Sequence, residues 1–505
     1  MSDALETLLR LRAWEQGKPI NRGQRVNVAI SDDEDIMSVA FLRMGGESRP
    51  WGVAFGNPGS PPTVLSVPDG RDQTLVGDTM VILAKALLEF FRHPGFSTSS
   101  PDNFEVESAR QIWLPGPTHI EMLHFLALTY AKTRFKRDDV EVLQCLGNLA
   151  NCLYIEHQRP GQQIVISAAA ALRECFVFPS AAIRQAHLGH LLGWLKGGSS
   201  RADRIGAATR AEEQSVATML NPELERSSLE PLVDRWNEAK VSGNKTDESE
   251  SERAISRLLT KELISRWNLT NDAIAVLRAD QRKSNSGLSE LVKSGARQFH
   301  ELWGSRAVKE YDGDIPYWPN VYTDTNSKTS AFGYIMRNAA NQEARARLVH
   351  GDRELQREQL AAGHGVIARV VSVSAAAASW RLQYSYPPLP TIEPGDYFVI
   401  AGSPTEQFVV RSVDLESREM EIEPQWKKGN SKANPPKLGP TDSSWKGREL
   451  VLLDDAPFSL TRNLAFRARK RTTGVSDILD LVQPYVRNQA TNDELGAMTE
   501  VGESE

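Results

Sequence analysis

Metal-binding residue types gather at two places in the chain. Zinc sites combine Cys, His and carboxylate ligands in recurring spacings such as Cys-x-x-Cys and His-Glu-x-x-His. The sequence contains neither spacing, so we interpret these residues as core or surface side chains and expect no metal or other cofactor. The two groups are His119, Glu121 and His124, and His187 and His190 with Cys175 upstream.

A second set of residues could cleave phosphodiester bonds. Glu421 and Glu423 alternate along a predicted strand, and Lys427 and Lys428 follow it. A metal-dependent nuclease needs acidic side chains and a lysine that converge on a divalent ion. Because side chains two apart on a strand point to the same face, we interpret both glutamates as the exposed side of that strand. An enzyme whose site is assembled from dispersed residues stays open, but the sequence favours a non-enzymatic protein.

Two other catalytic signatures are missing from the sequence. A phosphate-binding loop would require a Gly-rich turn that ends in Gly-Lys-Ser or Gly-Lys-Thr after a strand. A serine hydrolase of the nucleophile-elbow type would require Gly-x-Ser-x-Gly. The chain contains neither pattern, so neither nucleotide hydrolysis nor serine hydrolysis has support.

Local positive charge is the feature that departs from the acidic average of the chain. Residues 427–448 hold six basic residues against one acid, Asp442, a net charge of +5, and residues 462–471 hold basic residues without an acid. Tryptophans bracket the first segment, so bases could stack where phosphates are neutralised. The alternative is a solvated basic loop and helix. The candidate nucleic-acid-binding residues are Trp426, Lys427, Lys428, Lys432, Lys437, Trp445, Lys446, Arg448, Arg462, Arg467, Arg469, Lys470 and Arg471.

Size and composition are those of a multidomain globular protein. A chain of 505 residues has room for about three domains. A formal net charge of -6 and a pI near 6.0 exclude a uniformly basic nucleic-acid binder. The longest apolar run, 80–91, is interrupted by Lys85 and Glu89 and is too short to span a membrane. Three cysteines fit reduced thiols, and no signal peptide opens the chain, so we expect a cytoplasmic protein without a membrane partner.

A small antiparallel sheet is predicted for the first part of the chain. After a short first helix, apolar residues alternate in four runs, and an acidic turn, 32–35, is expected to lie exposed between the first two. From Asp72 the apolar residues recur at helical spacing. We therefore predict a sheet with flanking helices in 1–110 and an α-helical domain in 111–240. The predicted strands are 25–30, 37–43, 51–55 and 63–67.

A polar segment and further helices follow. Residues 241–253 contain little apolar surface and are predicted to be a flexible linker. Helical periodicity returns in 254–279, with 268–271 as a turn and helix N-cap. Such a helix pair could be a DNA-binding helix-turn-helix, but packing is the preferred interpretation because no basic cluster lies on the second helix. Residues 254–362 are predicted to be a helical region that ends in a long polar arm, 332–362.

Short apolar and β-branched runs fill residues 365–454, with turns rich in Gly and Pro between them. Five or six such strands predict a small β-barrel, SH3-like or OB-like, for 363–456. Beyond it we expect a basic helical segment, 457–486, and a disordered acidic tail, 487–505. The expected fold class is α+β, multidomain, with an N-terminal small antiparallel sheet, a central mostly α-helical region and a C-terminal small β-barrel.

The order of parts in 332–454 resembles the stalk and β-barrel insert of superfamily 1 helicases. A long polar helical arm leads into the first barrel strand, 365–371, and then into the turn 389–396. The resemblance rests on this arrangement alone and includes no helicase motor motif, so no functional residue is carried over. It implies a barrel that touches nucleic acid or guards a channel, in a protein that acts beside a separate motor.

We therefore expect a non-enzymatic accessory protein that binds DNA or RNA through the barrel loop and the basic segment. Its expected partners are a separate helicase or nuclease in a bacterial DNA-processing or anti-phage defence complex. The alternative is a protein–protein interaction scaffold whose helical region, 117–240, docks a partner without nucleic-acid contact. Salt-dependent binding to nucleic acid distinguishes the two.

Overall fold

We describe the fold from a computed structural model of the 505-residue chain. The structure describes residues 3–91, 110–292, 344–374, 379–386, 392–424 and 445–454, apart from 23, 24, 27, 48, 281, 285, 286, 289, 290 and 345. These residues form two compact units. The first comprises 3–158, 162–284, 288 and 291–292, and the second comprises 159–161, 287 and the residues from Ala344 onward.

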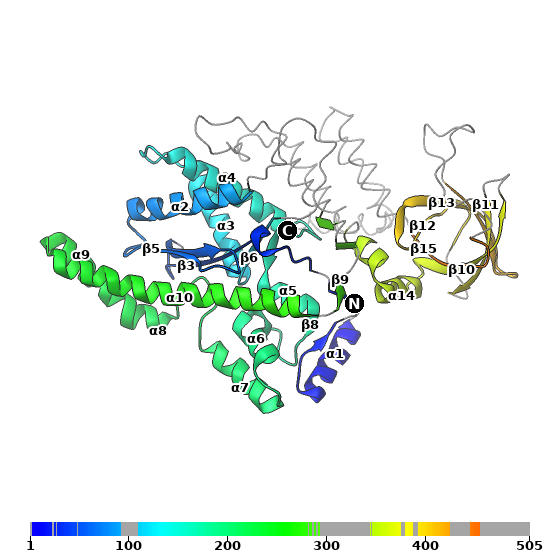
Figure 1. The fold of residues 1–505 in the computed structure, drawn as a ribbon, viewed down its shortest axis with the longest axis horizontal. Coiled ribbons are helices and arrows are strands. Elements are labelled where there is room, and N and C mark those ends of the chain that lie inside the picture. The colour runs from blue at the N-terminus through cyan, green and yellow to red at the C-terminus, as the bar shows by residue number, and fades with distance from the viewer. Residues whose placement is uncertain are drawn as a thin grey trace, which may run out of the picture. The chain divides into compact units, whose positions relative to one another are not determined.

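A five-stranded sheet lies at the centre of the first unit (Figure 1). Its strand order is β5-β4-β3-β6-β7. Strand β3 is buried along nearly its whole length because it lies between two other strands and under helices on both faces, which is why its sequence is a continuous apolar run. The strands are β3 (Ile36–Arg43), β4 (Pro50–Gly56), β5 (Thr63–Ser66), β6 (Gln111–Leu114) and β7 (Val165–Ser167).

The sheet is mixed, and it crosses the predicted boundary between residues 110 and 111. Strands β3, β4 and β5 are antiparallel, as predicted. Strands β6 and β7 then join in parallel, with Met37 opposite Ile112 and Ile112 opposite Val165. Residues on both sides of the predicted boundary therefore share one sheet, and the helices of 111–240 do not form a core of their own.

Helices cover both faces of this sheet. Figure 1 shows α2 (Gln73–Phe91) and α4 (Val140–His157) on one side and the long helix α10 (Lys245–Ala279) along the other. Helix α3 (Pro117–Tyr130) packs against α4. Side chains from the sheet and from all four helices belong to one apolar cluster, so the sheet needs α10 to bury its second face.

Shorter elements complete the first unit, and some of them surround a second apolar cluster that includes Trp113, Leu172 and Ile274. Strand β1 pairs with β8, and β2 pairs with β9. The elements are α1 (Asp3–Gln16), β1 (Ile20–Asn21), β2 (Arg25–Val26), η1 (Asp33–Asp35), α5 (Ala168–Cys175), β8 (Phe176–Val177), η3 (Arg184–Ala186), α6 (Leu188–Lys196), α7 (Arg201–Glu212), α8 (Pro222–Leu224), η4 (Glu225–Leu229), α9 (Glu230–Ser242) and β9 (Lys283–Ser284).

The segment predicted as a flexible linker is helical instead. Gly243, with a positive φ of 73°, ends α9, and α10 begins two residues later at Lys245. Asn244 caps the new helix by accepting a hydrogen bond from the main-chain N–H of Asp247, and acidic residues in the first turn complement the helix dipole. The predicted linker, 241–253, is corrected to a tight turn between two helices that pack against each other.

The turn predicted at 268–271 is also absent, because α10 continues through it. Thr270 is accommodated inside the helix, where its hydroxyl donates a hydrogen bond to the carbonyl oxygen of Arg266 at 3.1 Å. The Ser38 hydroxyl donates to the Asn271 side chain at 2.7 Å. These polar side chains pair within the helix and with the sheet instead of breaking the helix, so 254–279 is not a helix-turn-helix.

The second unit contains a closed antiparallel β-barrel, which confirms the predicted C-terminal barrel and the α+β fold class. Neighbouring strands follow the order β10-β11-β14-β13-β12-β15. The barrel has six strands, one more than an OB-fold. Helix α14 (Arg353–Ala361) precedes it and packs on β10 and β15. The strands are β10 (Gly365–Ser374), β11 (Ser379–Tyr386), β12 (Tyr397–Ile400), β13 (Ser403–Asp414), β14 (Glu419–Pro424) and β15 (Glu449–Asp454).

Several predicted segments lie outside the described residues. They are the first part of the arm, 332–343, the loop 425–444, the basic segment 457–486 and the tail 487–505. The described part of the chain contains no helix with the length and apolar character needed to cross a bilayer.

Candidate nucleic-acid interface

Three of the predicted nucleic-acid-binding residues lie in the described part of the chain, and all three belong to the turn that leads into β15. They are Trp445, Lys446 and Arg448. The other ten candidates lie outside the described residues: Trp426, Lys427, Lys428, Lys432, Lys437, Arg462, Arg467, Arg469, Lys470 and Arg471.

The turn 445–448 is fixed on strand β10 by main-chain hydrogen bonds. The Gly447 N–H donates to the carbonyl oxygen of Val370 at 2.8 Å, and the Val370 N–H donates to the carbonyl oxygen of Arg448 at 2.9 Å. Gly447 has a φ of 83°, a left-handed conformation that glycine adopts without strain. The position of Lys446 and Arg448 on the barrel surface is therefore set by the backbone.

Trp445 helps to hold this turn in place. Its ring centroid lies 5.1 Å from that of Trp380, which in turn lies 5.3 Å from Phe408 inside the barrel. The guanidinium carbon of Arg448 lies 5.1 Å from the Trp445 ring centroid, within cation–π range. Trp445 is thus half-buried between Trp380 and Arg448. Only the exposed part of its ring could contact a ligand.

Two further arginines, Arg369 on β10 and Arg381 on β11, extend the basic surface. Both side chains are exposed, and the residues on either side of each are buried, because alternate residues of a barrel strand point outward. Arg369 pairs in register with Gln383 and Arg381 pairs with Ser372. Since Val370 binds the turn 445–448, Arg369 lies beside that turn, and Arg381 lies on the next strand across β10. We call Arg369, Arg381, Lys446 and Arg448 the basic barrel face.

No carboxylate forms an ion pair with the basic barrel face within the described residues. Glu449 lies opposite Arg369 and Glu421 opposite Arg381 in the strand register, yet neither is within ion-pair distance. The Glu421 carboxylate accepts a hydrogen bond from the Ser379 hydroxyl at 2.7 Å instead. None of the four cations is thus held in an ion pair with another described residue, although Arg369 and Arg381 each have a carboxylate as cross-strand neighbour.

The hairpin of β13 and β14 has the opposite charge. Residues 414–423 contain five carboxylates and one arginine, Arg418. Arg411 on β13 is paired with Glu423 at 2.7 Å. Cations therefore gather on β10 and the turn 445–448, carboxylates gather on the β13–β14 hairpin, and the two groups meet where Arg381 of β11 lies opposite Glu421 of β14. A polyanion would be attracted to the first group and repelled from the second.

Glu421 and Glu423, the carboxylates considered for nuclease chemistry, both bind side chains of neighbouring barrel strands. Glu421 binds Ser379, and Glu423 binds Arg411. No group of three or more potential metal ligands occurs in the parts of the chain that the structure describes. The interpretation of Glu421 and Glu423 as the outward side of a strand agrees with this arrangement.

His119 is a buried structural histidine. Its Nδ1 accepts a hydrogen bond from the main-chain N–H of Phe41 at 3.1 Å, so the ring proton resides on Nε2, which lies 3.0 Å from the carbonyl oxygen of Val216. Burial lowers the pKa of His119 to about 3, because the charged form would lose its hydration. The ring is therefore neutral and joins β3 to the segment after α7.

The second histidine pair also bonds within the protein. The His187 Nδ1 accepts from the main-chain N–H of His190 at 3.1 Å, which caps α6. The Nε2 of His190 accepts from the Trp194 indole at 3.1 Å, and its Nδ1 lies 2.7 Å from Glu212. The Nε2 of His190 is thus hydrogen-bonded, and its Nδ1 faces the Glu212 carboxylate. The cysteines, Cys145, Cys152 and Cys175, are free and buried.

The charge run in the sequence indicated Trp445, Lys446 and Arg448 as candidates but gave no sign of Arg369 and Arg381. Single arginines within apolar strands do not form a charge run, and only the pairing of β10 with β11 and with β15 relates them to the turn. Comparison of the chain with protein-family models, with curated proteins and with solved structures finds no match in any of the three.

Proposed function

We propose that the protein is a non-enzymatic accessory factor that binds nucleic acid through the basic barrel face. The observation that carries this proposal is that Arg369, Arg381, Lys446 and Arg448 project from β10, β11 and the turn into β15 without forming ion pairs among the described residues. Four cations on a rigid surface neutralise several phosphates at once.

The position of the basic barrel face in the chain supports the same function. The turn 445–448 is the end of the segment 427–448, which has a net charge of +5. The cations of the described turn are thus continuous in sequence with the rest of the predicted binding loop. The carboxylates of the β13–β14 hairpin limit the attraction to one side of the barrel and so orient a bound strand.

The kind of partner is proposed from the way in which the basic barrel face would bind a strand. A barrel that binds phosphates without reading base edges recognises a strand by charge, which suits a factor that works beside a separate helicase or nuclease in a DNA-processing or defence complex. DNA and RNA are both expected to bind, because phosphate contacts do not distinguish the sugars.

The test is binding of fluorescein-labelled single- and double-stranded DNA and RNA to the full chain, followed by anisotropy over a series of salt concentrations. We expect affinity to fall as salt rises. Replacing Arg369 and Arg381 together by Gln should weaken binding at low salt and lower the slope of log K against log salt by about one per lost phosphate contact.

A matched control is available on the same barrel. Arg411→Gln with Arg418→Gln removes two arginines from the acidic hairpin and should leave binding unchanged or only slightly weaker. A further variant with Lys427, Lys428, Arg469 and Lys470 changed to Glu tests the remaining basic residues. The proposal is abandoned if the full chain shows no salt-dependent binding, or if both arginine pairs affect binding equally.

A further inference from the structure

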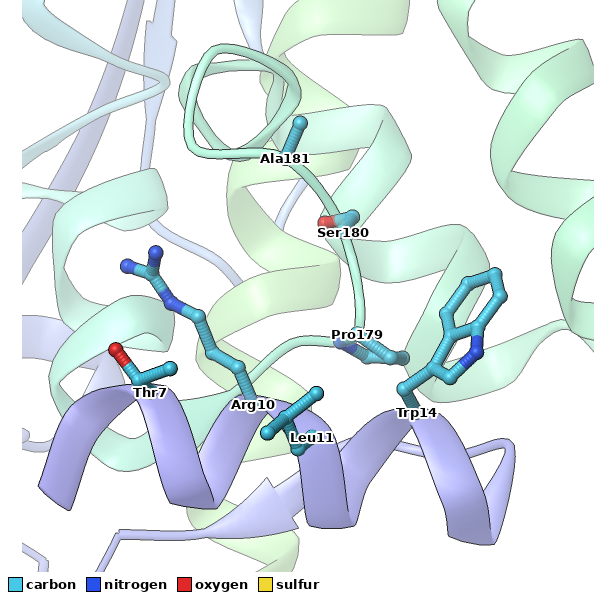
Figure 2. A pocket seen from close by; sticks show the side chains of 7 residues that line it. All are labelled: Thr7, Arg10, Leu11, Trp14, Pro179, Ser180 and Ala181. Carbon is cyan, nitrogen blue, oxygen red and sulfur yellow. The ribbon is translucent and has the colours of Figure 1, made fainter. Parts of the chain in front are cut away.

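An open hollow lies between helix α1 and the segment that follows β8 (Figure 2). Its volume is about 280 Å³. Thr7, Arg10, Leu11 and Trp14 line it from one face of α1, since they recur at helical spacing, and residues 179–181 form the opposite wall. The hollow is too small and too open to enclose a drug-sized molecule, for which pockets are typically larger and more closed.

The two walls are tied together by the local fold. Strand β1, which follows α1, pairs with β8, and β8 leads into Pro179. The Gln185 side chain donates to the carbonyl oxygen of Ser180 at 2.9 Å. The hollow is therefore a preformed feature of the surface, and a ligand would not need to order it.

Large apolar side chains are exposed around the hollow. Leu11 is 55% exposed and Trp14 is 49% exposed, and nearby in the sequence Leu8 is 62% and Ile183 is 84% exposed. Single exposed apolar residues are ordinary, but a group of them beside a concave surface marks a docking site. Leu11 and Trp14 contribute to the hollow without filling it.

Three arginines, Arg10, Arg22 and Arg201, lie in or next to the walls of the hollow. The Arg201 guanidinium lies over the Trp14 ring, 4.1 Å from its centroid, and Arg201 has no carboxylate partner within the described residues. On the α1 side, Arg10 and Arg22 share one carboxylate, that of Glu6. The hydrogen bond from Arg22 holds the pKa of Glu6 below its ordinary value. The Glu6 carboxylate is therefore ionised and already paired with Arg10 and Arg22.

We propose that this hollow docks a short segment of a partner protein in which apolar side chains are flanked by carboxylates. The apolar side chains would fill the space between Leu11 and Pro179, and a carboxylate would pair with Arg201 beside Trp14. Tryptophan and arginine are the residue types that most often dominate binding energy at protein interfaces. An acidic segment fits the surface better than a basic one because Arg201 lacks an anion.

The probe is a labelled synthetic amphipathic peptide of Leu, Ala and Glu, compared with two peptides in which Gln or Lys replaces every Glu. Anisotropy with the full chain should give the order Glu, then Gln, then Lys in decreasing affinity. Arg201→Glu should weaken the Glu peptide at least about fivefold and make the Lys peptide the stronger ligand. Leu11→Ser should weaken all three peptides.

Controls separate this surface from general charge and from the barrel. Leu128→Ser removes another exposed leucine, 64% exposed on α3, and Arg210→Glu reverses an exposed charge elsewhere on α7; neither should change binding. The Arg369→Gln and Arg381→Gln variant should keep full peptide affinity. The proposal is overturned if the three peptides bind alike, or if Arg201→Glu and Leu11→Ser bind as the native chain does while remaining folded by circular dichroism.

Discussion

The guanidinium of Arg266 donates a hydrogen bond to the main-chain carbonyl oxygen of Ala217 at 2.8 Å. Arg266 is completely buried in the middle of α10, where it also donates to the carbonyl oxygen of Met219 and to the Glu262 carboxylate. The segment between α7 and α8 is therefore held by Arg266 of α10, which lies 49 residues beyond Ala217 in the sequence and donates to its carbonyl oxygen.

Replacing Arg266 by Met should destabilise the first unit by about 3 kcal/mol, because it leaves Glu262 and two carbonyl groups without their donor. Urea unfolding of the full chain measures the loss, and hydrogen exchange should rise in residues 214–221. Arg253→Met, an exposed arginine of the same helix that binds only Ser249, is the control and should change stability little. Equal effects of the two substitutions would contradict the role given to Arg266.

Acid should destabilise the protein through His119. The folded pKa is about 3 and lies below the unfolded value of about 6.5, so the unfolded chain takes up a proton first as the pH falls. Stability contributed by the neutral ring is therefore full above pH ~6.5 and is lost towards pH ~3, at up to about 1.4 kcal/mol per pH unit.

His119→Gln tests this pH dependence, since glutamine can accept from Phe41 and donate to Val216 without titrating. Between about pH 7 and about pH 5 the native chain should lose about 2 kcal/mol more than the variant. The comparison uses urea unfolding at each pH. Parallel pH profiles for the two proteins would show that His119 does not titrate on unfolding.

Trp445→Ala should loosen the turn 445–448 and remove a half-buried ring from the end of the barrel. We expect a loss of about 2 kcal/mol, less than for a fully buried tryptophan, and faster hydrogen exchange at Gly447, whose N–H binds Val370. Trp445→Phe should retain most of the protection. If the turn is protected equally in Trp445→Ala, the contact with Trp380 does not hold it.

Asn244→Ala should shorten α10 at its first turn. The Asn244 side chain accepts from Asp247 N–H, and loss of such a cap costs about 1 kcal/mol. Hydrogen exchange in 245–250 should increase, whereas Asn244→Asp should preserve the cap. Rapid exchange of this segment in the native chain would instead support the flexible linker that its composition suggested.

The barrel and strands β3, β4 and β5 could be predicted because their apolar residues alternate or run continuously over strand lengths. Strands β6 and β7 could not, since four and three residues are too few to show a period. Their existence depends on partners in β3 and in each other. The predicted domain boundary failed for this reason, as local patterns do not record pairing between distant segments.

The start of α10 was missed because polarity was taken as absence of structure. Ser251 is buried, Asn244 caps the helix, and Arg235 of α9 forms ion pairs with Asp247 and Glu250. Polar residues thus stabilise a helix where caps and cross-helix pairs are available. The candidate site was only partly predictable: charge density indicated 445–448, but the register of β10 and β11 was needed to add Arg369 and Arg381.

Helix α10 packs on one face of the central sheet, and this has a consequence for folding during translation. Strand β3 ends at Arg43, whereas α10 ends at Ala279, so one apolar face of the sheet lacks its helix until more than two hundred further residues have been translated. At roughly 5–20 residues per second, this delay lasts on the order of 10–50 seconds. During that time the uncovered apolar face is open to aggregation, and the ribosome must finish α10 before the first unit can close.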